Sequence, residues 1–159
     1  MQVRKMMTSN PACVTPEDSV RDAARLMKEH DCGLIPVVED RDSKRLVGVI
    51  TDRDIAVRLV GEGKGGDAKV SEAMSRDPSC ASPDTDISEV ERIMSERQVR
   101  RVPVVDSAGR LEGIVAQADL ALSDDRGVSD REVARTVERI SQPGDSSRRA
   151  SSEGARPMA

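Results

Sequence analysis

The sequence predicts an α+β protein built from two tandem β-α-β-β-α units related by a pseudo-twofold axis, followed by a short C-terminal helix and a disordered tail. The main observation is an internal duplication: residues 7–56 recur in degenerate form as residues 74–121, at an offset of 67 (74 − 7). A second observation is that extended and helical apolar patterns follow the same order in both copies. Two similar units imply a cleft between equivalent surfaces, and small ligands bind in clefts.

The duplication defines residue equivalences along most of the two copies. Identical pairs at the offset of 67 include Met7/Met74, Pro11/Pro78, Cys13/Cys80, Pro16/Pro83, Met27/Met94 and residues 36–38 with 103–105. After a two-residue contraction of one loop the offset becomes 65, and residues 46–56 then align with residues 111–121.

In the first unit, a short extended segment at residues 13–16 precedes a helix that we expect to open near Pro16. Proline and acidic side chains both suit the first turn of a helix. The apolar residues Val20, Ala23, Ala24 and Met27 follow at helical spacing. Gly33 ends this pattern, and residues 35–38 and 46–50 then predict two short strands.

The second unit repeats this order. A helical pattern at Ile87, Val90 and Met94 is followed by predicted strands at residues 102–105 and 111–115 and by a helix starting at Asp119. Because a unit of about 50 residues has a marginal core alone, we expect the two units to share one core.

The chain divides into five predicted segments. They are repeat 1 at residues 1–62, a glycine-rich linker at 63–69, repeat 2 at 70–123, a helical extension at 124–140 and a disordered tail at 141–159. A capping-box pattern from Ser129 to Glu132 predicts that the helix of the extension runs from 129 to 140.

Composition excludes several classes of function. The chain has a formal net charge of −4 and no Phe, Trp or Tyr, so neither nucleic acid nor an anionic membrane is an expected partner. No segment resembles a signal peptide or a membrane span, and we expect a cytoplasmic protein. The three cysteines are expected to be buried small hydrophobes. No metal-ligand spacing or catalytic constellation stands out, so neither a metal site nor an enzyme is predicted.

Two runs, Ile35-Pro36-Val37-Val38 and Gly48-Val49-Ile50-Thr51-Asp52-Arg53-Asp54-Ile55, carry a resemblance to a known family. Within the duplication they resemble a pair of CBS domains, also called a Bateman module, over about residues 3–123. The chain is similar to small stand-alone bacterial members. The resemblance implies a regulatory module without a required cofactor. It also implies that AMP, ADP, ATP or a related adenosine ligand binds between the repeats, and that the module forms homodimers.

Thr51 and Asp54 lie at a predicted strand-to-helix junction and form the strongest local signal. A carboxylate accepts hydrogen bonds from ribose hydroxyls, the threonine hydroxyl can donate to a ligand oxygen, and a helix N-terminus favours anions. The alternative is that either residue only caps the helix. In repeat 2 Asp119 is kept but Ala116 replaces the threonine, so we expect two unequal sites.

Arg100 and Arg101 directly precede a predicted strand. The resemblance implies that basic residues here face ligand phosphates, for which guanidinium groups are well suited. The alternative is a solvated pair or an ion pair with nearby carboxylates. The full set of candidate ligand-binding residues is Thr15, Ile35, Pro36, Val37, Thr51, Arg53, Asp54, Arg100, Arg101, Val102, Pro103 and Asp119. The apolar members would hold adenine by aliphatic contact or serve only in the core.

Two functions remain open on the sequence. The first is an adenosine-ligand sensor whose signal is read by an unidentified protein partner. The second is a ligand-free dimerisation scaffold that acts through its C-terminal helix. The first predicts that Thr51, Asp54, Arg100 and Arg101 converge on one hollow, and the second predicts that they point apart.

Overall fold

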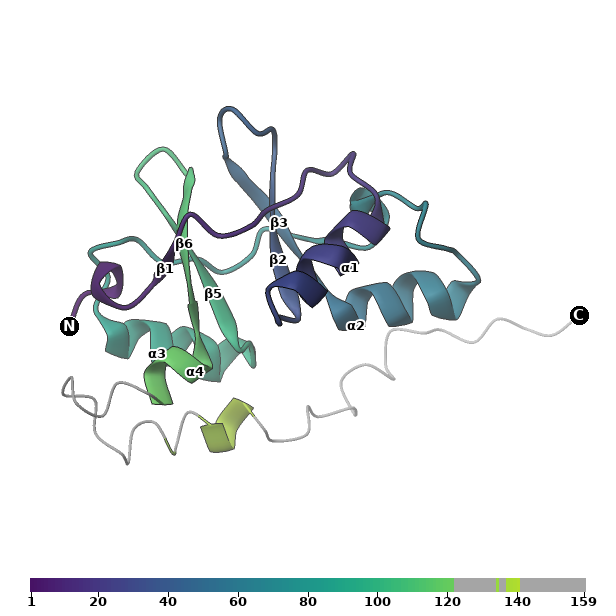
Figure 1. Ribbon diagram of the computed structural model, residues 1–159. Coiled ribbons are helices and arrows are strands. Elements are labelled where there is room, and N and C mark those ends of the chain that lie inside the picture. Colours follow the sequence, from purple (N-terminus) through teal and green to yellow (C-terminus); the bar gives the residue numbers. More distant parts are fainter. Residues whose placement is uncertain (122–133, 135–136, 141–159) are drawn as a thin grey trace, which may run out of the picture.

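The computed structural model describes residues 1–121, 134 and 137–140. Within this part the α+β class and the two β-α-β-β-α repeats are confirmed, and the repeats lie side by side (Figure 1). The predicted tail and most of the predicted helix at 129–140 lie outside the described residues. No helix in the described part of the chain is long and apolar enough to cross a membrane.

Repeat 1 consists of a helix packed on an antiparallel hairpin. Its elements are α1 (Val20–Glu29), β2 (Leu34–Val38), β3 (Leu46–Thr51) and α2 (Asp52–Asp54), which continues as a π-helical turn (Ile55–Leu59) and a 3-10 turn (Val60–Glu62). The extended segment before α1 contacts the hairpin through a parallel bridge between Val14 and Val37.

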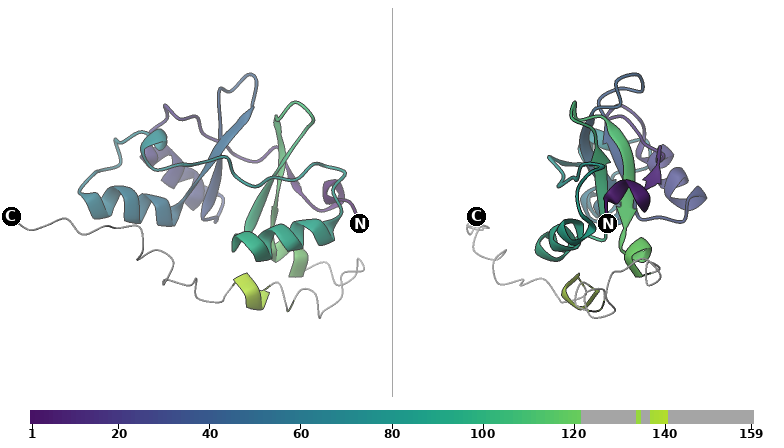
Figure 2. Two further views of the ribbon diagram at one scale, coloured as in Figure 1. Left: turned by 180° about the vertical axis from the view of Figure 1, so that it is seen from behind. Right: turned by 90° about the vertical axis from the view of Figure 1, so that its left-hand side faces the viewer.

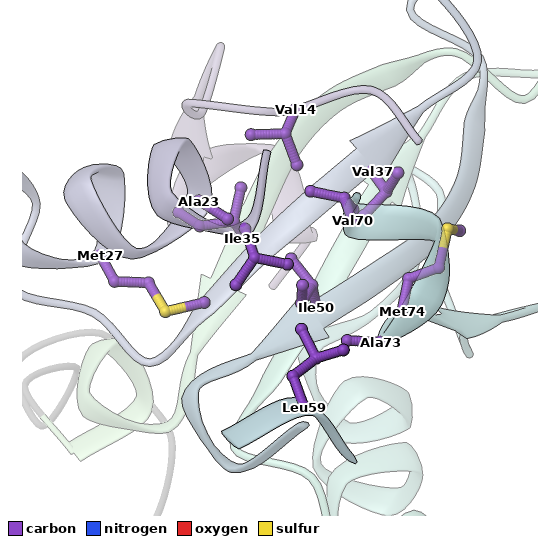
Figure 3. Packing of buried hydrophobic residues seen from close by; sticks show 11 residues of the cluster. Val14, Ala23, Met27, Ile35, Val37, Ile50, Leu59, Val70, Ala73 and Met74 are labelled. Carbon is purple, nitrogen blue, oxygen red and sulfur yellow. The ribbon is translucent and has the colours of Figure 1, made fainter. Parts of the chain in front are cut away.

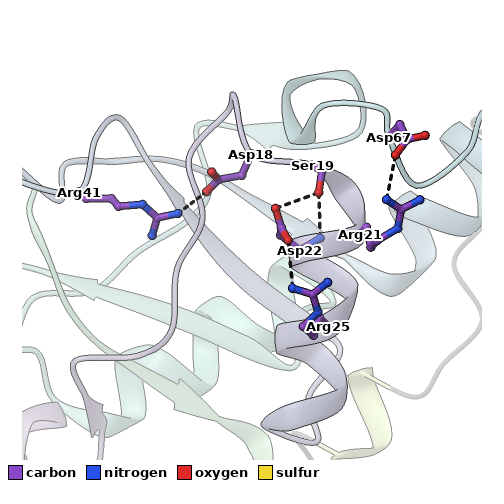
Figure 4. Close-up of polar contacts among 7 residues, drawn as sticks. All are labelled: Asp18, Ser19, Arg21, Asp22, Arg25, Arg41 and Asp67. Atoms are coloured by element: carbon purple, nitrogen blue, oxygen red, sulfur yellow. Dashed lines mark hydrogen bonds and ion pairs between the residues drawn. The ribbon is translucent and has the colours of Figure 1, made fainter.

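Helix α1 begins at Val20, so the predicted start near Pro16 is wrong. The reason is a side-chain cap at Ser19, whose hydroxyl oxygen accepts a hydrogen bond from the backbone N–H of Asp22 (Figure 4). The preceding residues form a turn in which the backbone N–H of Thr15 donates to the Asp18 carboxylate. The Asp18 carboxylate accepts from Thr15 and Arg41, so Ser19 is the residue whose side chain caps the helix.

Repeat 2 has the same architecture. Its elements are α3 (Ile87–Arg97), β5 (Arg101–Val105), β6 (Leu111–Ala116) and α4 (Gln117–Ala121). A parallel bridge between Ala81 and Val104 is equivalent to the bridge at Val14. Helix α4 begins at Gln117, two residues before the start that the sequence predicts at Asp119.

The repeats exchange their first strands. Strand β1 (Thr8–Ser9) pairs with β6, giving the sheet order β1-β6-β5, and β4 (Ser75–Arg76) pairs with β3, giving β2-β3-β4. Figures 1 and 2 show the N-terminal segment lying along the sheet of repeat 2. The segment that opens each repeat therefore completes the sheet of the other.

The same exchange completes two separate cores. Val3, at the N-terminus, is fully buried among repeat 2 residues such as Val102 and Met94. Val70, which is equivalent to Val3 at the offset of 67, is buried in repeat 1 beside Ile35 (Figure 3). The expected single shared core is thus wrong for the described residues. Each marginal unit gains apolar contacts from a segment of the other.

Two glycines allow the exchanged strands to approach. A Cβ atom at Gly48 would lie 2.5 Å from the carbonyl oxygen of Ser75 and would also overlap the side chain of Met74. A Cβ atom at Gly113 would lie 2.5 Å from Sδ of Met7 and 3.0 Å from the carbonyl oxygen of Thr8. The glycine of each Gly-Val-Ile or Gly-Ile-Val run is therefore needed because another backbone crosses it.

The cysteines differ from expectation. Cys13 and Cys32 are only partly buried and Cys80 is exposed, so none is the fully buried small hydrophobe that the sequence predicts. Partial burial raises the pKa of the Cys13 and Cys80 thiols. Cys13 and Cys80 lie in extended segments before α1 and α3, where no apolar periodicity in the sequence indicates whether a side chain is buried.

Candidate functional site

A hollow of about 620 Å³ lies between the two repeats, where β2 and β5 begin and β3 and β6 end. We call it the inter-repeat hollow. Repeat 1 lines it with Gly33, Leu34, Thr51, Asp52 and Arg53, and repeat 2 lines it with residues 98–101 and 116–118. Most of these residues form equivalent pairs under the duplication, one from each repeat. The pseudo-twofold axis that relates the repeats therefore passes through the hollow.

Equivalent backbone hydrogen bonds position the two sides of this hollow. The N–H of Asp52 donates to the carbonyl oxygen of Gly33 at 3.0 Å, and the N–H of Gln117 donates to that of Arg100 at 2.8 Å. Each bond ties the start of a helix to the segment before a strand. A Cβ atom at Gly33 would lie 3.0 Å from a carboxylate oxygen of Asp52, so this glycine leaves room for the carboxylate.

Thr51 and Asp54 bond to each other in a reciprocal cap. The N–H of Asp54 donates to the Thr51 hydroxyl oxygen, and the N–H of Thr51 donates to Oδ2 of Asp54, both at 3.1 Å. The predicted capping role is thus present. Because the hydroxyl accepts in this bond, its own proton stays available to a ligand. Nε of Arg58 lies 3.7 Å from Oδ1 of Asp54, whose side chain is 15% exposed.

Repeat 2 keeps only half of this arrangement. The N–H of Ala116 donates to Oδ2 of Asp119 at 2.8 Å, but no hydroxyl is present to complete the cap. The strand-to-helix junction of repeat 2 therefore offers a carboxylate without the neighbouring hydroxyl donor.

Three arginines line the inter-repeat hollow: Arg53, Arg100 and Arg101. No carboxylate among the described residues forms an ion pair with any of them. Arg92 on α3 shows the usual contrast, because Glu89 and Glu96 both bond to it and raise the pKa of its guanidinium. With Asp52 as the one carboxylate in its lining, the hollow carries a net positive formal charge.

A second, smaller hollow of about 180 Å³ adjoins β2 and β6. Its lining includes Thr8, Ala12, Cys32, Ile35, Pro36 and Ile114. Leu34 and Arg101, which are equivalent at the offset of 67, line both hollows and so lie between them. The exchanged segment around Thr8 forms one wall, so this hollow also needs both repeats.

The predicted site residues fall into five groups. Thr51, Arg53, Arg100 and Arg101 come together at the inter-repeat hollow, and Ile35, Pro36 and Arg101 line the second hollow. Asp54 and Asp119 bond to the backbone at the strand-to-helix junctions and line neither hollow, so the predicted convergence is found for Thr51, Arg100 and Arg101 but not for Asp54. Val37, Val102 and Pro103 are buried in their strands. Thr15 precedes α1 and lines neither hollow.

Sequence reasoning missed Leu34, Asp52 and Gln117 at the inter-repeat hollow. Leu34 was available by subtracting the offset of 67 from Arg101. Asp52 and Gln117 are the first residues of α2 and α4. Apart from their position at the strand-to-helix junctions, nothing in the sequence indicated that they line the hollow.

A further hollow of about 570 Å³ lies over α1. Its charged side chains largely bond to one another: Arg41 donates to Asp18 at 2.8 Å, and Arg25 donates to Asp22 at 3.4 Å (Figure 4). This pairing leaves less free charge for a ligand than the inter-repeat hollow offers.

Comparison with known proteins gives a consistent result. A family model described as "CBS domain" matches residues 3–61 and 70–123. The CBS domain-containing protein YhcV of Bacillus subtilis is 41% identical over 121 residues, which cover 76% of this chain and 84% of YhcV. Hypoxic response protein 1 of Mycobacterium tuberculosis is 35% identical over 141 residues, or 88% of this chain and 94% of the relative.

Solved structures with the same fold contain different ligands. CBSX2 in complex with AMP is 30% identical with a TM-score of 0.66, over 79% of this chain and 98% of CBSX2. The CBS domain pair of MJ0100, with 5′-methylthioadenosine and S-adenosylmethionine, is 30% identical with a TM-score of 0.68, over 77% and 94% of the two chains.

One solved neighbour holds metal. Hypoxic Response Protein I with two coordinated zinc ions is 35% identical with a TM-score of 0.70, over 77% of this chain and 98% of that chain. In the described part of this chain, no group of three or more His, Cys, Asp or Glu side chains is placed to hold a metal ion.

Proposed function

The chain belongs to the CBS-domain family, as a tandem pair of repeats, and from this premise we propose that it is a regulatory module rather than an enzyme. Its proposed ligand is an adenosine compound of the AMP, ADP and ATP class, bound in the inter-repeat hollow. The observation that supports this most strongly is the convergence of Thr51 with Arg53, Arg100 and Arg101 on one hollow.

The chemistry of the hollow fits the parts of a nucleotide. The Thr51 hydroxyl can donate to a ribose or phosphate oxygen of the ligand. Asp54 does not line the hollow, and it supports the site by holding Thr51 through their reciprocal bonds. The guanidinium groups bind phosphate oxygens. The adenosine compounds in CBSX2 and MJ0100 support the same ligand class.

Binding in this position offers a route to regulation. Both repeats line the hollow, so a ligand there contacts both at once. The ligand shifts the balance between two relative positions of the repeats only as far as it binds them with different affinity. We propose that a protein partner detects this shift, and that the module works in the cytoplasm as a homodimer. The exposed side chains of Val57 and Val60 on the helix after Asp54 support an apolar contact between copies.

Calorimetric titration of the purified protein with AMP, ADP, ATP, NAD and S-adenosylmethionine tests the proposal. An ultraviolet spectrum comes first, because a chain without Trp or Tyr barely absorbs near 280 nm and co-purified adenine is visible at about 260 nm. We expect a dissociation constant of about 100 μM or lower for at least one nucleotide.

A matched pair of variants tests the asymmetry of the repeats. Asp54→Asn weakens nucleotide binding more than Asp119→Asn, because only Asp54 has a hydroxyl partner at its junction. Equal losses in the two variants contradict the asymmetry. Absence of binding across the whole panel rejects the sensor and leaves the scaffold.

A further inference from the structure

We propose that the C-terminal segment at residues 137–140 is a docked regulatory element, which completes the core of repeat 2 through Ile140 and responds to a ligand in the inter-repeat hollow. The segment is helical and lies on the side of repeat 2 that carries α3 and α4 (Figures 1 and 2). Its response to a ligand rests on the proposed function. The new element is the route by which the state of the hollow reaches another part of the molecule.

Ile140 is buried in the core of repeat 2. Its side chain is 8% exposed and belongs to the same cluster as Met94, Val102 and Leu120. The three residues directly before it, 137–139, are exposed. Within the described segment, a single side chain therefore makes the contact with the core.

Comparison of the two cores shows which place Ile140 takes. Most buried members of one cluster have their equivalent under the duplication in the other cluster. These pairs are Val14/Ala81, Val20/Ile87, Ala23/Val90, Met27/Met94, Ile35/Val102, Val37/Val104, Ile50/Val115 and Val70/Val3. Ile140 lies outside both repeats and has no equivalent.

Leu59 is the member of the repeat 1 core that lacks an apolar equivalent. Its side chain is 1% exposed and packs among the residues of Figure 3. At the offset of 65 its equivalent is Asp124, a charged residue. Ile140 therefore supplies to repeat 2 the buried apolar side chain that Leu59 supplies to repeat 1.

The two side chains are connected to the hollow in different ways. Leu59 belongs to a helical run that continues without a break from α2 to Glu62, so it is fixed to the Thr51 junction. Ile140 belongs to a segment separate from α4, which is described over Gln117–Ala121. Ile140 can therefore leave the core of repeat 2 without unwinding α4, whereas Leu59 cannot leave without unwinding its own helix.

Helix α4 links this segment to the inter-repeat hollow. Gln117 and Ala118 line the hollow, and Leu120, two residues later, is 1% exposed in the cluster that contains Ile140. Ile55, the equivalent of Leu120, is only partly buried. A ligand restricts α4 from the hollow, and docked Ile140 restricts it from the core. Because an element that is already ordered costs less to order again, ligand and segment favour each other.

Methyl NMR of the full chain tests whether the segment docks. The isoleucine δ1 methyl groups are labelled, and Ile140→Val removes and thereby assigns the signal of Ile140. We expect nuclear Overhauser contacts between this methyl group and leucine and valine methyl groups of the repeat 2 core. Ile140→Ala lowers the melting temperature by about 5 °C or more, because the core loses part of a buried side chain. Glu138→Ala, at an exposed position of the same segment, leaves it unchanged.

Calorimetric titration with AMP and, separately, with ATP tests the link to the hollow. We expect Ile140→Ala to weaken the binding of these nucleotides by about fivefold or more, although Ile140 lines neither hollow. Val3→Ala is the matched control, because it removes part of a buried side chain from the same core, at a residue bonded to Thr85 before α3. It lowers the melting temperature but keeps the affinity within about twofold of the wild type.

The outcomes separate docking, its link to the hollow and the proposed function. Without contacts from the Ile140 methyl group to the repeat 2 core, the segment does not dock and the proposed role is wrong. Equal losses of affinity in Ile140→Ala and Val3→Ala, or no loss in either, also overturn this role, while the proposed function stands. If the wild type binds neither nucleotide, the proposed function fails and the link fails with it. Docking contacts together with a loss of affinity confined to Ile140→Ala support both.

Discussion

Thr51 and Asp54 hold each other in place before any ligand is present. Their reciprocal bonds at 3.1 Å fix both side chains at the junction between β3 and α2. The sequence suggested either a cap or a ligand contact. The geometry makes the two roles compatible, because the hydroxyl proton of Thr51 is not used by the cap. A side chain held in this way needs no reordering when it meets a ligand.

The half-formed cap of repeat 2 gives a prediction at the residue scale. Ala116→Thr supplies the missing hydroxyl beside Asp119, whose carboxylate already accepts the backbone N–H of residue 116. We expect the free energy of unfolding to rise by up to about 1 kcal/mol, the usual value of such a cap. Urea denaturation measures this.

The reverse change serves as the comparison. Thr51→Ala removes the hydroxyl that accepts the N–H of Asp54, and we expect a loss of about 1 kcal/mol. A gain in repeat 2 without a matching loss in repeat 1, or the opposite, contradicts the equivalence of the two junctions.

The short strands β1 and β4 are held in place by close contacts between the two repeats. Strands β1 and β4 have two residues each, too few to be stable by themselves. Each is held against a strand of the other repeat, at Gly113 and Gly48 respectively. The lack of a side chain at these positions is what lets the two backbones come together.

Gly48 therefore carries a prediction at the element scale. Gly48→Ala places a Cβ atom 2.5 Å from the Ser75 carbonyl oxygen, and β4 has to move. We expect a loss of about 2 kcal/mol in the free energy of unfolding, as for other overpacked sites. Gly65→Ala is the matched control, since an added Cβ there meets nothing within 4 Å. Equal stability of the two variants in urea denaturation contradicts a tight crossing at β4.

At the scale of the whole molecule, the two repeats have separate hydrophobic cores, and each core contains residues from the first segment of the other repeat. Val3 and Val70 are equivalent residues, each fully buried in the core of the opposite repeat. The backbone N–H of Val3 bonds to Thr85 and that of Val70 bonds to Asp18, at 2.9 Å in both cases. The repeats therefore stabilise each other through buried side chains as well as through sheet pairing.

This arrangement predicts matched effects of distant substitutions. Val3→Ala and Val70→Ala each lower the free energy of unfolding by about 2 kcal/mol, through lost burial and a small cavity. Because the two cores are separate clusters, the losses add in the double variant. Lys28→Ala is the control, at an exposed position on α1. Chemical denaturation checks all four proteins, and a Val3→Ala protein as stable as the control contradicts the exchanged core.

Much of the fold was predictable because it depends on patterns among residues that are close in the sequence. The strands at β2, β3, β5 and β6 follow short apolar runs, and the helices α1 and α3 follow helical spacing. The start of α1 was not predictable from Pro16 and the acidic residues after it, because the Asp18 carboxylate bonds to Thr15 and to the distant Arg41 while Ser19 caps the helix. The partial exposure of the cysteines depends on which segments pack beside them, and no periodicity records that.

The sequence by itself determined the duplication, the order of elements, and the Thr51–Asp54 junction with its weakened copy at Ala116 and Asp119. These features are visible because they depend on neighbouring residues and on two copies that can be compared. Only the tertiary structure decided that the repeats exchange their first strands and that Leu34 and Arg101 lie between two hollows. It also decided that three arginines without an ion pair among the described residues meet in one of these hollows. The physical reason is that residues from different repeats meet only where the chain crosses between the sheets. The crossing depends on the packing of both cores at once, which no local pattern contains.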